Sequence, residues 1–304
     1  MKKKFIAKRK KSINYKFFLF VIVFILSLYI GYKYLDNSNK KIDDKELVSI
    51  LFKDSNHHYK NNLINKILNS IKIEKPVSIL NSNYKKLVNV NYINKKKVIK
   101  NDPVIYIYNT HQTEEYMPSS YAEYSVRPTV QMVNYILEEK FNNGNYKTIV
   151  EERKIKDILN MHKWNYSYSY RASRVFMEDS KRNNDSLKYF IDVHRDSVSK
   201  KHTTITINNK NYAKILFIVG LENRNYKYNL DFTNKINSIL NNKYPNLSRG
   251  VYKKSGRGVN GIYNQDFSPN TILVEIGGKD NTVEEVLNTS LVFAECFMEA
   301  INNE

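Results

Sequence analysis

Three short segments in the C-terminal two-thirds of the chain carry side chains that could bind a metal and activate water. They are Tyr108 to Tyr116, Ile191 to Ser197 and Ile272 to Gly278. Each begins with an apolar run typical of a β-strand and delivers a His or a Glu at or near the end of that run. Neutral imidazoles and a carboxylate are the ligands of a catalytic zinc, which keeps one coordination position for water. The segments therefore predict zinc-dependent hydrolytic chemistry.

We expect His111, Glu114 and His194 to bind the zinc. Glu275 interrupts the apolar run of the third segment. Buried Glu is rare unless it is paired or functional, and burial would raise its pKa towards the range useful for acid–base work. Glu275 is thus predicted as the proton acceptor for the metal-bound water, with a Glu that reaches solvent at a strand end as the alternative.

Neighbouring carboxylates leave two assignments open. Glu114 and Glu115 are adjacent and should point in different directions, so only one can reach the metal, and spacing alone does not decide which. Either Asp192 or Asp196 could hold the second ring nitrogen of His194, which is a common arrangement around metal-bound histidines. A surface carboxylate is the competing interpretation for each of these two residues.

Three arginines are candidates for substrate binding. Arg171 and Arg174 lie on a predicted helix rich in Tyr and Ser, and Arg195 directly follows His194. A guanidinium can clamp a substrate carboxylate through two parallel hydrogen bonds. Simple exposed charges on a helix explain the first two equally well.

Strands and helices alternate from Val104 onwards. Strands are predicted over 104–108, 146–150, 189–193, 203–207, 213–219 and 271–276, and helices over 128–141, 167–181, 230–240 and 282–302. The stretch 208–211 between two of the strands has the composition of a hairpin turn. The pattern predicts an α/β fold with a mixed sheet covered by helices on both faces. Functional groups at strand ends match where open α/β sheets place their sites.

The N-terminus predicts a membrane anchor. Residues 1–16 carry eight Lys or Arg and no acid, and residues 17–35 are mostly apolar or aromatic. A basic block before an apolar span places the N-terminus in the cytoplasm and the rest outside. A cleaved signal peptide is the alternative, but no small-x-small cleavage site follows the apolar run.

The remainder divides into a linker and a domain. Residues 36–100 contain two stretches with helical spacing, at 43–53 and 61–73, and then an Asn- and Lys-rich segment, so we expect a helical stalk and a flexible tether before a domain over 101–304. A single cysteine excludes an intramolecular disulfide. The net charge of +19, of which +11 remains beyond residue 16, suits anionic lipid or cell wall. It would also suit nucleic acid, which the expected topology disfavours.

Several motifs together resemble a known family. They are Asn109 to Tyr116, Asp192 to Ser197, Tyr244 to Gly250, Tyr263 to Pro269, Val274 to Gly278 and Asn281 to Glu285. In order and spacing they resemble the stage II sporulation protein P family, and the resemblance covers about residues 102–302. An N-terminal anchor before an extracytoplasmic domain also fits that family.

That family is similar to the zinc-dependent N-acetylmuramoyl-L-alanine amidases. The resemblance implies a zinc amidase-like fold and cleavage of the bond between the lactyl group and the stem peptide of peptidoglycan, with peptide cross-link cleavage also ascribed to the family. It implies action in septal wall remodelling such as engulfment during sporulation, beside the stage II sporulation proteins D and M. By resemblance, His111, Glu114 and His194 fall on metal positions and Glu275 on the catalytic glutamate.

One position departs from the family pattern. Many relatives carry two histidines in the first motif, whereas this chain has Asn109 at the earlier position. We expect His111 to be the ligand. If the earlier position were the ligand instead, the chain would be a catalytically weak wall-binding partner with an amidase-like fold, which is the alternative function.

Overall fold

The computed structural model describes residues 19, 22–30, 42–57, 102–124 and 127–302. The chain divides into two compact units, Met1–Lys41 and Ile42–Glu304. No helix within the described ranges is long and apolar enough to cross a membrane. The anchor predicted over 17–35 falls partly on residues outside those ranges and stays a prediction, and the tether predicted before residue 101 lies outside them altogether.

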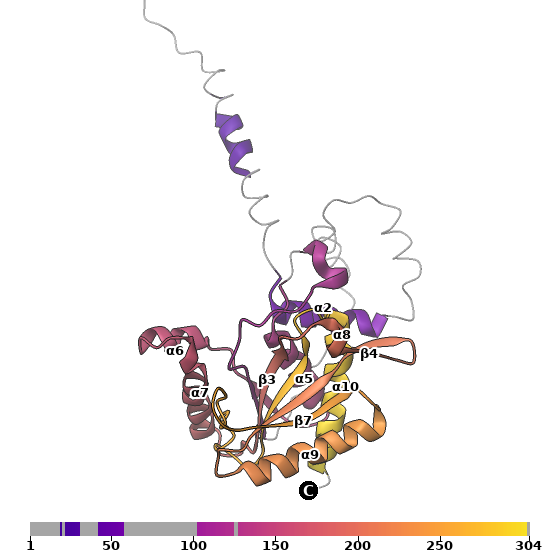
Figure 1. Ribbon diagram of the computed structural model, residues 1–304. Helices are drawn as coiled ribbons and strands as arrows, with labels where there is room; N and C mark the ends of the chain where they lie inside the picture. The colour runs from indigo at the N-terminus through magenta and orange to yellow at the C-terminus, as the bar shows by residue number, and fades with distance from the viewer. Residues whose placement is uncertain (1–18, 20–21, 31–41, 58–101, 125–126, 303–304) are drawn as a thin grey trace, which may run out of the picture. The chain divides into compact units, whose positions relative to one another are not determined.

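A six-stranded mixed sheet forms the centre of the second unit (Figure 1). Its strand order is β2-β1-β3-β8-β6-β7. The strands are β1 (Ile105–Tyr108), β2 (Thr148–Val150), β3 (Tyr189–Asp196), β6 (Ile215–Gly220), β7 (Ser248–Lys254) and β8 (Thr271–Gly278). Neighbours run parallel except for β6 and β8, which are antiparallel. The predicted mixed α/β sheet is confirmed.

Side chains alternate between the two faces of the sheet, as the pleat of a strand requires. On β3, Ile191 and Val193 belong to the main hydrophobic core, whereas Phe190 belongs to a separate cluster on the other face. The same alternation on β8 places Val274 in the main core and Leu273 on the other face. Asp192, His194 and Glu275 therefore share the face that does not carry the main core.

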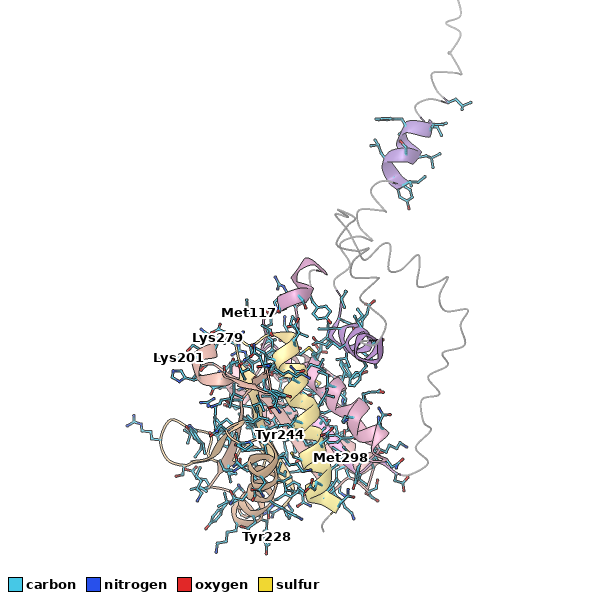
Figure 2. All side chains as sticks on the ribbon, turned by 90° about the vertical axis from the view of Figure 1, so that its right-hand side faces the viewer. Met117, Lys201, Tyr228, Tyr244, Lys279 and Met298 are labelled. Atoms are coloured by element: carbon cyan, nitrogen blue, oxygen red, sulfur yellow. The ribbon has the colours of Figure 1, made fainter. Side chains whose placement is uncertain are left out.

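Helices cover both faces (Figure 1). On the main-core side lie α5 (Val130–Asn143), α9 (Tyr226–Lys243) and α10 (Val283–Asn302), and on the other side lie α6 (Ile155–Met161) and α7 (Ser169–Asn183). The remaining helical turns are η1 (Ser119–Tyr124), η2 (Tyr166–Tyr168) and α8 (Lys200–Thr203). Helices α5 and α10 fit closely, because a side chain at Gly144, where α5 ends, would collide with the sulfur of Met298 on α10. Figure 2 labels Met298 on that helix.

Helix α2 (Asp44–His57) includes the first helical stretch of the predicted stalk. Leu47, Val48 and Leu51 are buried in the main core, where α2 packs against α5. The carboxylate of Asp44 accepts hydrogen bonds from the amide and the hydroxyl of Thr129 at the start of α5. This part of the predicted stalk therefore belongs to the compact unit Ile42–Glu304, and the boundary predicted near residue 101 stays a prediction.

The predicted hairpin is only partly right. Its turn forms at Asn208 and Asn209, both in the left-handed region, but it joins β4 (Thr204–Ile207) to the short β5 (Lys210–Ala213) in a separate two-stranded sheet. The apolar run that we expected as the second hairpin strand is β6, which pairs with β7 and β8 instead. Strand β7 and helix α6 were not predicted. The sequence of β7 has no apolar alternation, and α6 is only seven residues long, so the helical spacing of Ile155, Ile158 and Leu159 spans little more than one turn.

Candidate metal centre

The ends of β1 and β3 bring the predicted ligands together. β1 ends at Tyr108, and His111 lies in the turn that follows, where the amide of Glu114 donates to the carbonyl of His111 at 3.2 Å. His194 lies within β3, which extends to Asp196, rather than just after the strand. Because β1 and β3 are parallel neighbours, their C-terminal ends open at the same edge of the sheet.

The three predicted ligands form one cluster. Nδ1 of His111 lies 3.6 Å from Oε1 of Glu114, and Nδ1 of His194 lies 3.7 Å from Oε2 of the same carboxylate. One donor atom of each residue lies within 4.8 Å of the others. Donors bound tetrahedrally to zinc at about 2.1 Å stand about 3.4 Å apart. Two imidazoles and a carboxylate at this spacing fit a zinc ion.

Asp192 contacts His194 from the opposite side of the ring. Nε2 of His194 lies 3.0 Å from Oδ1 of Asp192 in a bent contact, and Asp192 is fully buried. Burial acts to lower the pKa of His194, but the neighbouring carboxylates, Asp192 foremost, raise it to about 9. A carboxylate on the second nitrogen fixes the tautomer of a ligand histidine. Nδ1 is therefore the nitrogen left to face Glu114.

Glu275 lies beside His194 on the neighbouring strand. The two residues are direct partners in the register of β3 and β8. Oε2 of Glu275 is buried and has no hydrogen-bond partner among the residues that the structure describes. Burial first, and the charge of Asp196 second, raise the pKa of Glu275 to about 7. A carboxylate with a free oxygen and a pKa near neutrality is suited to accept and return a proton.

Glu114, and not Glu115, carries its carboxylate between the two imidazoles. Burial acts to raise the pKa of Glu114, but His111, His194 and the amide of Arg195 lower it overall. That amide donates to Oε2 of Glu114 at 2.9 Å. Glu115 is exposed and forms an isolated antiparallel bridge with Thr129. The adjacent carboxylates thus do point in different directions.

Comparison with known proteins identifies the family. The model of the family described as stage II sporulation protein P matches residues 29–298. The chain belongs to the stage II sporulation protein P family. It is 35% identical over 211 residues to stage II sporulation protein P of Bacillus subtilis (strain 168), in a match that covers 67% of this chain and 52% of the relative. The chain spans about half the length of that relative.

Solved structures share part of the fold at low identity. The CwlD amidase from Clostridioides difficile in complex with the GerS lipoprotein has a TM-score of 0.41 and 13% identity, over 67% of this chain and 98% of that chain. Cwp6 from Clostridium difficile has a TM-score of 0.40 and 10% identity, over 66% of this chain and 29% of that chain. A metallo-carboxypeptidase from Burkholderia cenocepacia has a TM-score of 0.36 and 9% identity, over 67% and 58% of the two chains.

Asn109, the position that departs from the family pattern, serves the fold. Its side chain is buried and exchanges amide hydrogen bonds with Asn134 on α5, at 3.2 and 2.6 Å. The same amide donates to the carbonyl of Val193 at 2.7 Å and so ties the end of β1 to β3. The side chain of Asn109 is thus engaged in contacts with the fold, whereas His111 lies in the cluster with Glu114 and His194.

The three predicted substrate arginines are engaged in protein contacts. Arg171 stacks over the ring of Trp164 at 4.4 Å. Arg174 donates to Glu178 and to Asp266, each at 2.9 Å. The guanidinium of Arg195 donates to the carbonyls of Glu115 and Asp196. Their roles in substrate binding stay predictions.

Several residues around the cluster were missed by the sequence reasoning. The ring of Tyr166 stacks on His111 with centroids 5.3 Å apart, and Tyr170 contacts the rings of both His111 and His194. Tyr166 is 53% exposed, so it borders the open side of the site. Both tyrosines lie in the Tyr- and Ser-rich segment that was noted only for its arginines. The spacing of aromatic residues in that segment was the only available signal.

Proposed function

We propose that this chain is a membrane-anchored extracytoplasmic zinc hydrolase that cleaves the amide bond between the lactyl group and the stem peptide of peptidoglycan. The observation that carries the proposal is the convergence of His111, Glu114 and His194 beside Glu275, whose buried oxygen has no partner in the described part of the chain. Membership of the stage II sporulation protein P family supports a role in wall remodelling during sporulation. The stage II sporulation proteins D and M are proposed partners.

The residues divide the chemistry between them. Bound zinc would polarise the scissile carbonyl and lower the pKa of the attacking water. His111, Glu114 and His194 hold the metal, and Asp192 keeps the tautomer of His194 in which Nδ1 carries the lone pair. Glu275 accepts the proton of the water on its free carboxylate oxygen and passes it to the departing amine of the stem peptide. Glu275 is thus ionised when it takes the proton from water and protonated when it gives that proton to the amine.

The proposal is tested by zinc content and by peptide release on the same preparation. Elemental analysis should find one zinc per chain, and mass spectrometry of digested sacculi should find free stem peptides. His111→Ala and His194→Ala should each lose both, because two protein ligands rarely retain zinc in a three-ligand site. His162→Ala is the matched control, since His162 is exposed and stacks on Trp164. Full zinc occupancy in both ligand variants would rule out this ligand set.

The alternative function has a distinct signature. A catalytically weak wall-binding partner would bind sacculi and release no stem peptide, whatever its zinc content. Such a result would retain the family and the wall as the target and remove the hydrolase. Release of cross-linked peptides instead of stem peptides would retain the hydrolase and change the bond that it cleaves.

A further inference from the structure

We infer that Thr110, Ser173 and Asn264 are positioning residues that fix the imidazole of His194 through Asp192. The inference rests on the proposed function, because it assigns His194 to the metal. It extends that function to a line of buried side chains from the turn after β1, from α7 and from the loop between β7 and β8, none of which belongs to the ligand cluster. In consequence, the loop that carries Asn264 also affects how tightly His194 binds the metal.

The line is continuous at hydrogen-bond distances. The amide of Asn264 donates to the hydroxyl of Ser173 at 2.9 Å, and that hydroxyl lies 2.9 Å from the hydroxyl of Thr110. The Thr110 hydroxyl donates to Oδ2 of Asp192 at 2.7 Å, and the Thr110 amide donates to Oδ1 at 2.9 Å. Oδ1 of Asp192 then lies 3.0 Å from Nε2 of His194, in a contact too bent to count as a hydrogen bond. Each of these residues is at least 92% buried.

The direction of the hydrogen bonds is set by the ends of the line. An ionised carboxylate only accepts and an amide NH2 only donates, so Asp192 draws the Thr110 proton towards itself while Asn264 supplies a proton to Ser173. The Ser173 hydroxyl is then free to donate either to Thr110 or to the carbonyl of Tyr170 at 3.1 Å. In the first case every donor points towards Asp192, and such chains reinforce one another.

This arrangement selects one tautomer of His194. Asp192 already accepts two hydrogen bonds from Thr110, so its carboxylate is held in place. A fixed carboxylate beside Nε2 requires a proton on that nitrogen, which leaves the lone pair on Nδ1. Nδ1 is the atom that faces Glu114 at 3.7 Å. The hydroxyl of Thr110 is thus two contacts away from the metal-binding atom.

The loop end of the line has an unusual backbone. Asn264 and Tyr263 both lie in the left-handed region, with φ of 56° and 54°. Asn tolerates this region, whereas for a bulky Tyr it is costly. The conformation turns the Asn264 amide onto Ser173 and the carbonyl of Tyr170, and it sets the ring of Tyr263 5.5 Å from that of Tyr170. Two contacts, one polar and one aromatic, therefore couple this loop to the residues around His194.

The test compares the zinc dissociation constant of full-length variants by competition with a chelator. Thr110→Val preserves the shape of the side chain and removes the hydroxyl, so it should weaken zinc binding by about 10- to 100-fold, the usual effect of losing a group behind a metal ligand. Thr110→Ser restores the hydroxyl and should restore the affinity. Ser173→Ala should weaken binding in the same direction. Asn264→Asp keeps the backbone preference and removes the donor, and it should do likewise.

A matched control separates positioning from stability. Ser290 on α10 is also buried, and its hydroxyl donates to a helix carbonyl as that of Ser173 does, but it lies outside the line. Ser290→Ala should leave zinc affinity unchanged even if it lowers the melting temperature. Equal affinity loss in Ser290→Ala and Ser173→Ala, or unchanged affinity in Thr110→Val, would overturn the inference.

A second readout does not depend on zinc. In protein labelled with ¹⁵N-histidine, the Nε2 proton of His194 should give a slowly exchanging resonance with and without metal, assigned by its loss in Asp192→Asn. Thr110→Val should speed its exchange, and Thr110→Ser should not. If the wild type binds no zinc, the proposed function fails while this resonance still decides the positioning role. If zinc binds and the resonance is indifferent to Thr110, the positioning role alone fails.

Discussion

Glu275 brings a carboxylate between the buried apolar side chains of Val274 and Ile276, and we propose that this placement serves catalysis. Glu275→Gln keeps the size of the side chain and removes the proton acceptor. It should retain zinc, because the cluster of three ligands is intact. It should lose about a hundred- to ten-thousand-fold in release of stem peptides from purified peptidoglycan, the usual contribution of general acid–base catalysis.

The measurement needs turnover, zinc content and thermal melting on one preparation. Near-wild-type release would reduce Glu275 to a structural carboxylate. Loss of zinc together with activity would place Glu275 among the ligands and would remove Glu114 from that set.

The same residue should make metal-free protein sensitive to pH. Burial first, and Asp196 second, raise the pKa of Glu275 from 4.5 to about 7. Because the folded state holds this proton more tightly than the unfolded chain does, the stability that it contributes is complete below pH 4.5 and is lost as the pH rises through about 7. Glu275→Gln cannot ionise. At pH 8 the variant should exceed metal-free wild type by about 1 to 3 kcal/mol in free energy of unfolding.

Urea unfolding at pH 4 and pH 8, with chelator present, checks this prediction. The two proteins should have similar stability at pH 4, since both side chains are then neutral. A difference that is the same at both pH values would show that ionisation of Glu275 is not its cause. Ionisation of Glu275 would then not lower the free energy of unfolding.

At the scale of an element, we expect the stability of the domain to depend on helix α2, which lies outside the sequence motifs. Leu47 is fully buried against α5, whereas Ile50 on the same helix is 36% exposed. Leu47→Ala should cost about 2 to 5 kcal/mol of unfolding free energy, the range for truncating a buried Leu. Ile50→Ala is the control and should change stability by about 0.5 kcal/mol or less.

Urea unfolding of the unit Ile42–Glu304 measures both variants. If Leu47→Ala were as stable as Ile50→Ala, α2 would pack on the domain without adding to its free energy of unfolding. A chain that begins at residue 101 would then be as stable as the longer one, whereas we expect it to be weaker.

The elements that the sequence predicted well are those with a strong local signal. The period of α10 and the apolar runs of β3 and β8 depend on neighbours in sequence, and their positions were confirmed within a few residues. Which distant segments pair as neighbouring strands could not be predicted from such local signals. The run that became β6 was assigned to the wrong partner, because a turn at Asn208 predicts a hairpin and says nothing of the space between β8 and β7.

The same division holds at the site. The residue types of His111, Glu114 and His194 predicted a metal-binding set, and the fold brings one donor atom of each within 4.8 Å of the others. The supporting residues Thr110, Ser173 and Asn264 are common polar types, and only the fold shows that their side chains meet. Choice between Glu114 and Glu115 likewise needed the geometry of the turn.

For the whole molecule, the charge distribution predicts topology. The chain has a net charge of +19, and residues 1–16 hold eight Lys or Arg without an acid. We expect this block to stay in the cytoplasm and residues 17–35 to anchor the chain, so that the catalytic unit lies outside. A substrate in the wall is accessible only with this orientation. The proposed reaction on peptidoglycan therefore requires that the domain lie outside the cytoplasm.

A reporter enzyme that is active only outside the cytoplasm, fused after Glu304, tests this orientation. The wild-type fusion should be active and should remain with the membrane fraction. Replacing the eight basic residues with Gln should lower reporter activity, because Lys and Arg near a span dominate its orientation while acids contribute little. A fusion that lacks residues 17–35 is the control and should be inactive and absent from membranes. Activity in the supernatant would favour a cleaved signal peptide, and a silent wild-type fusion would remove peptidoglycan as the substrate.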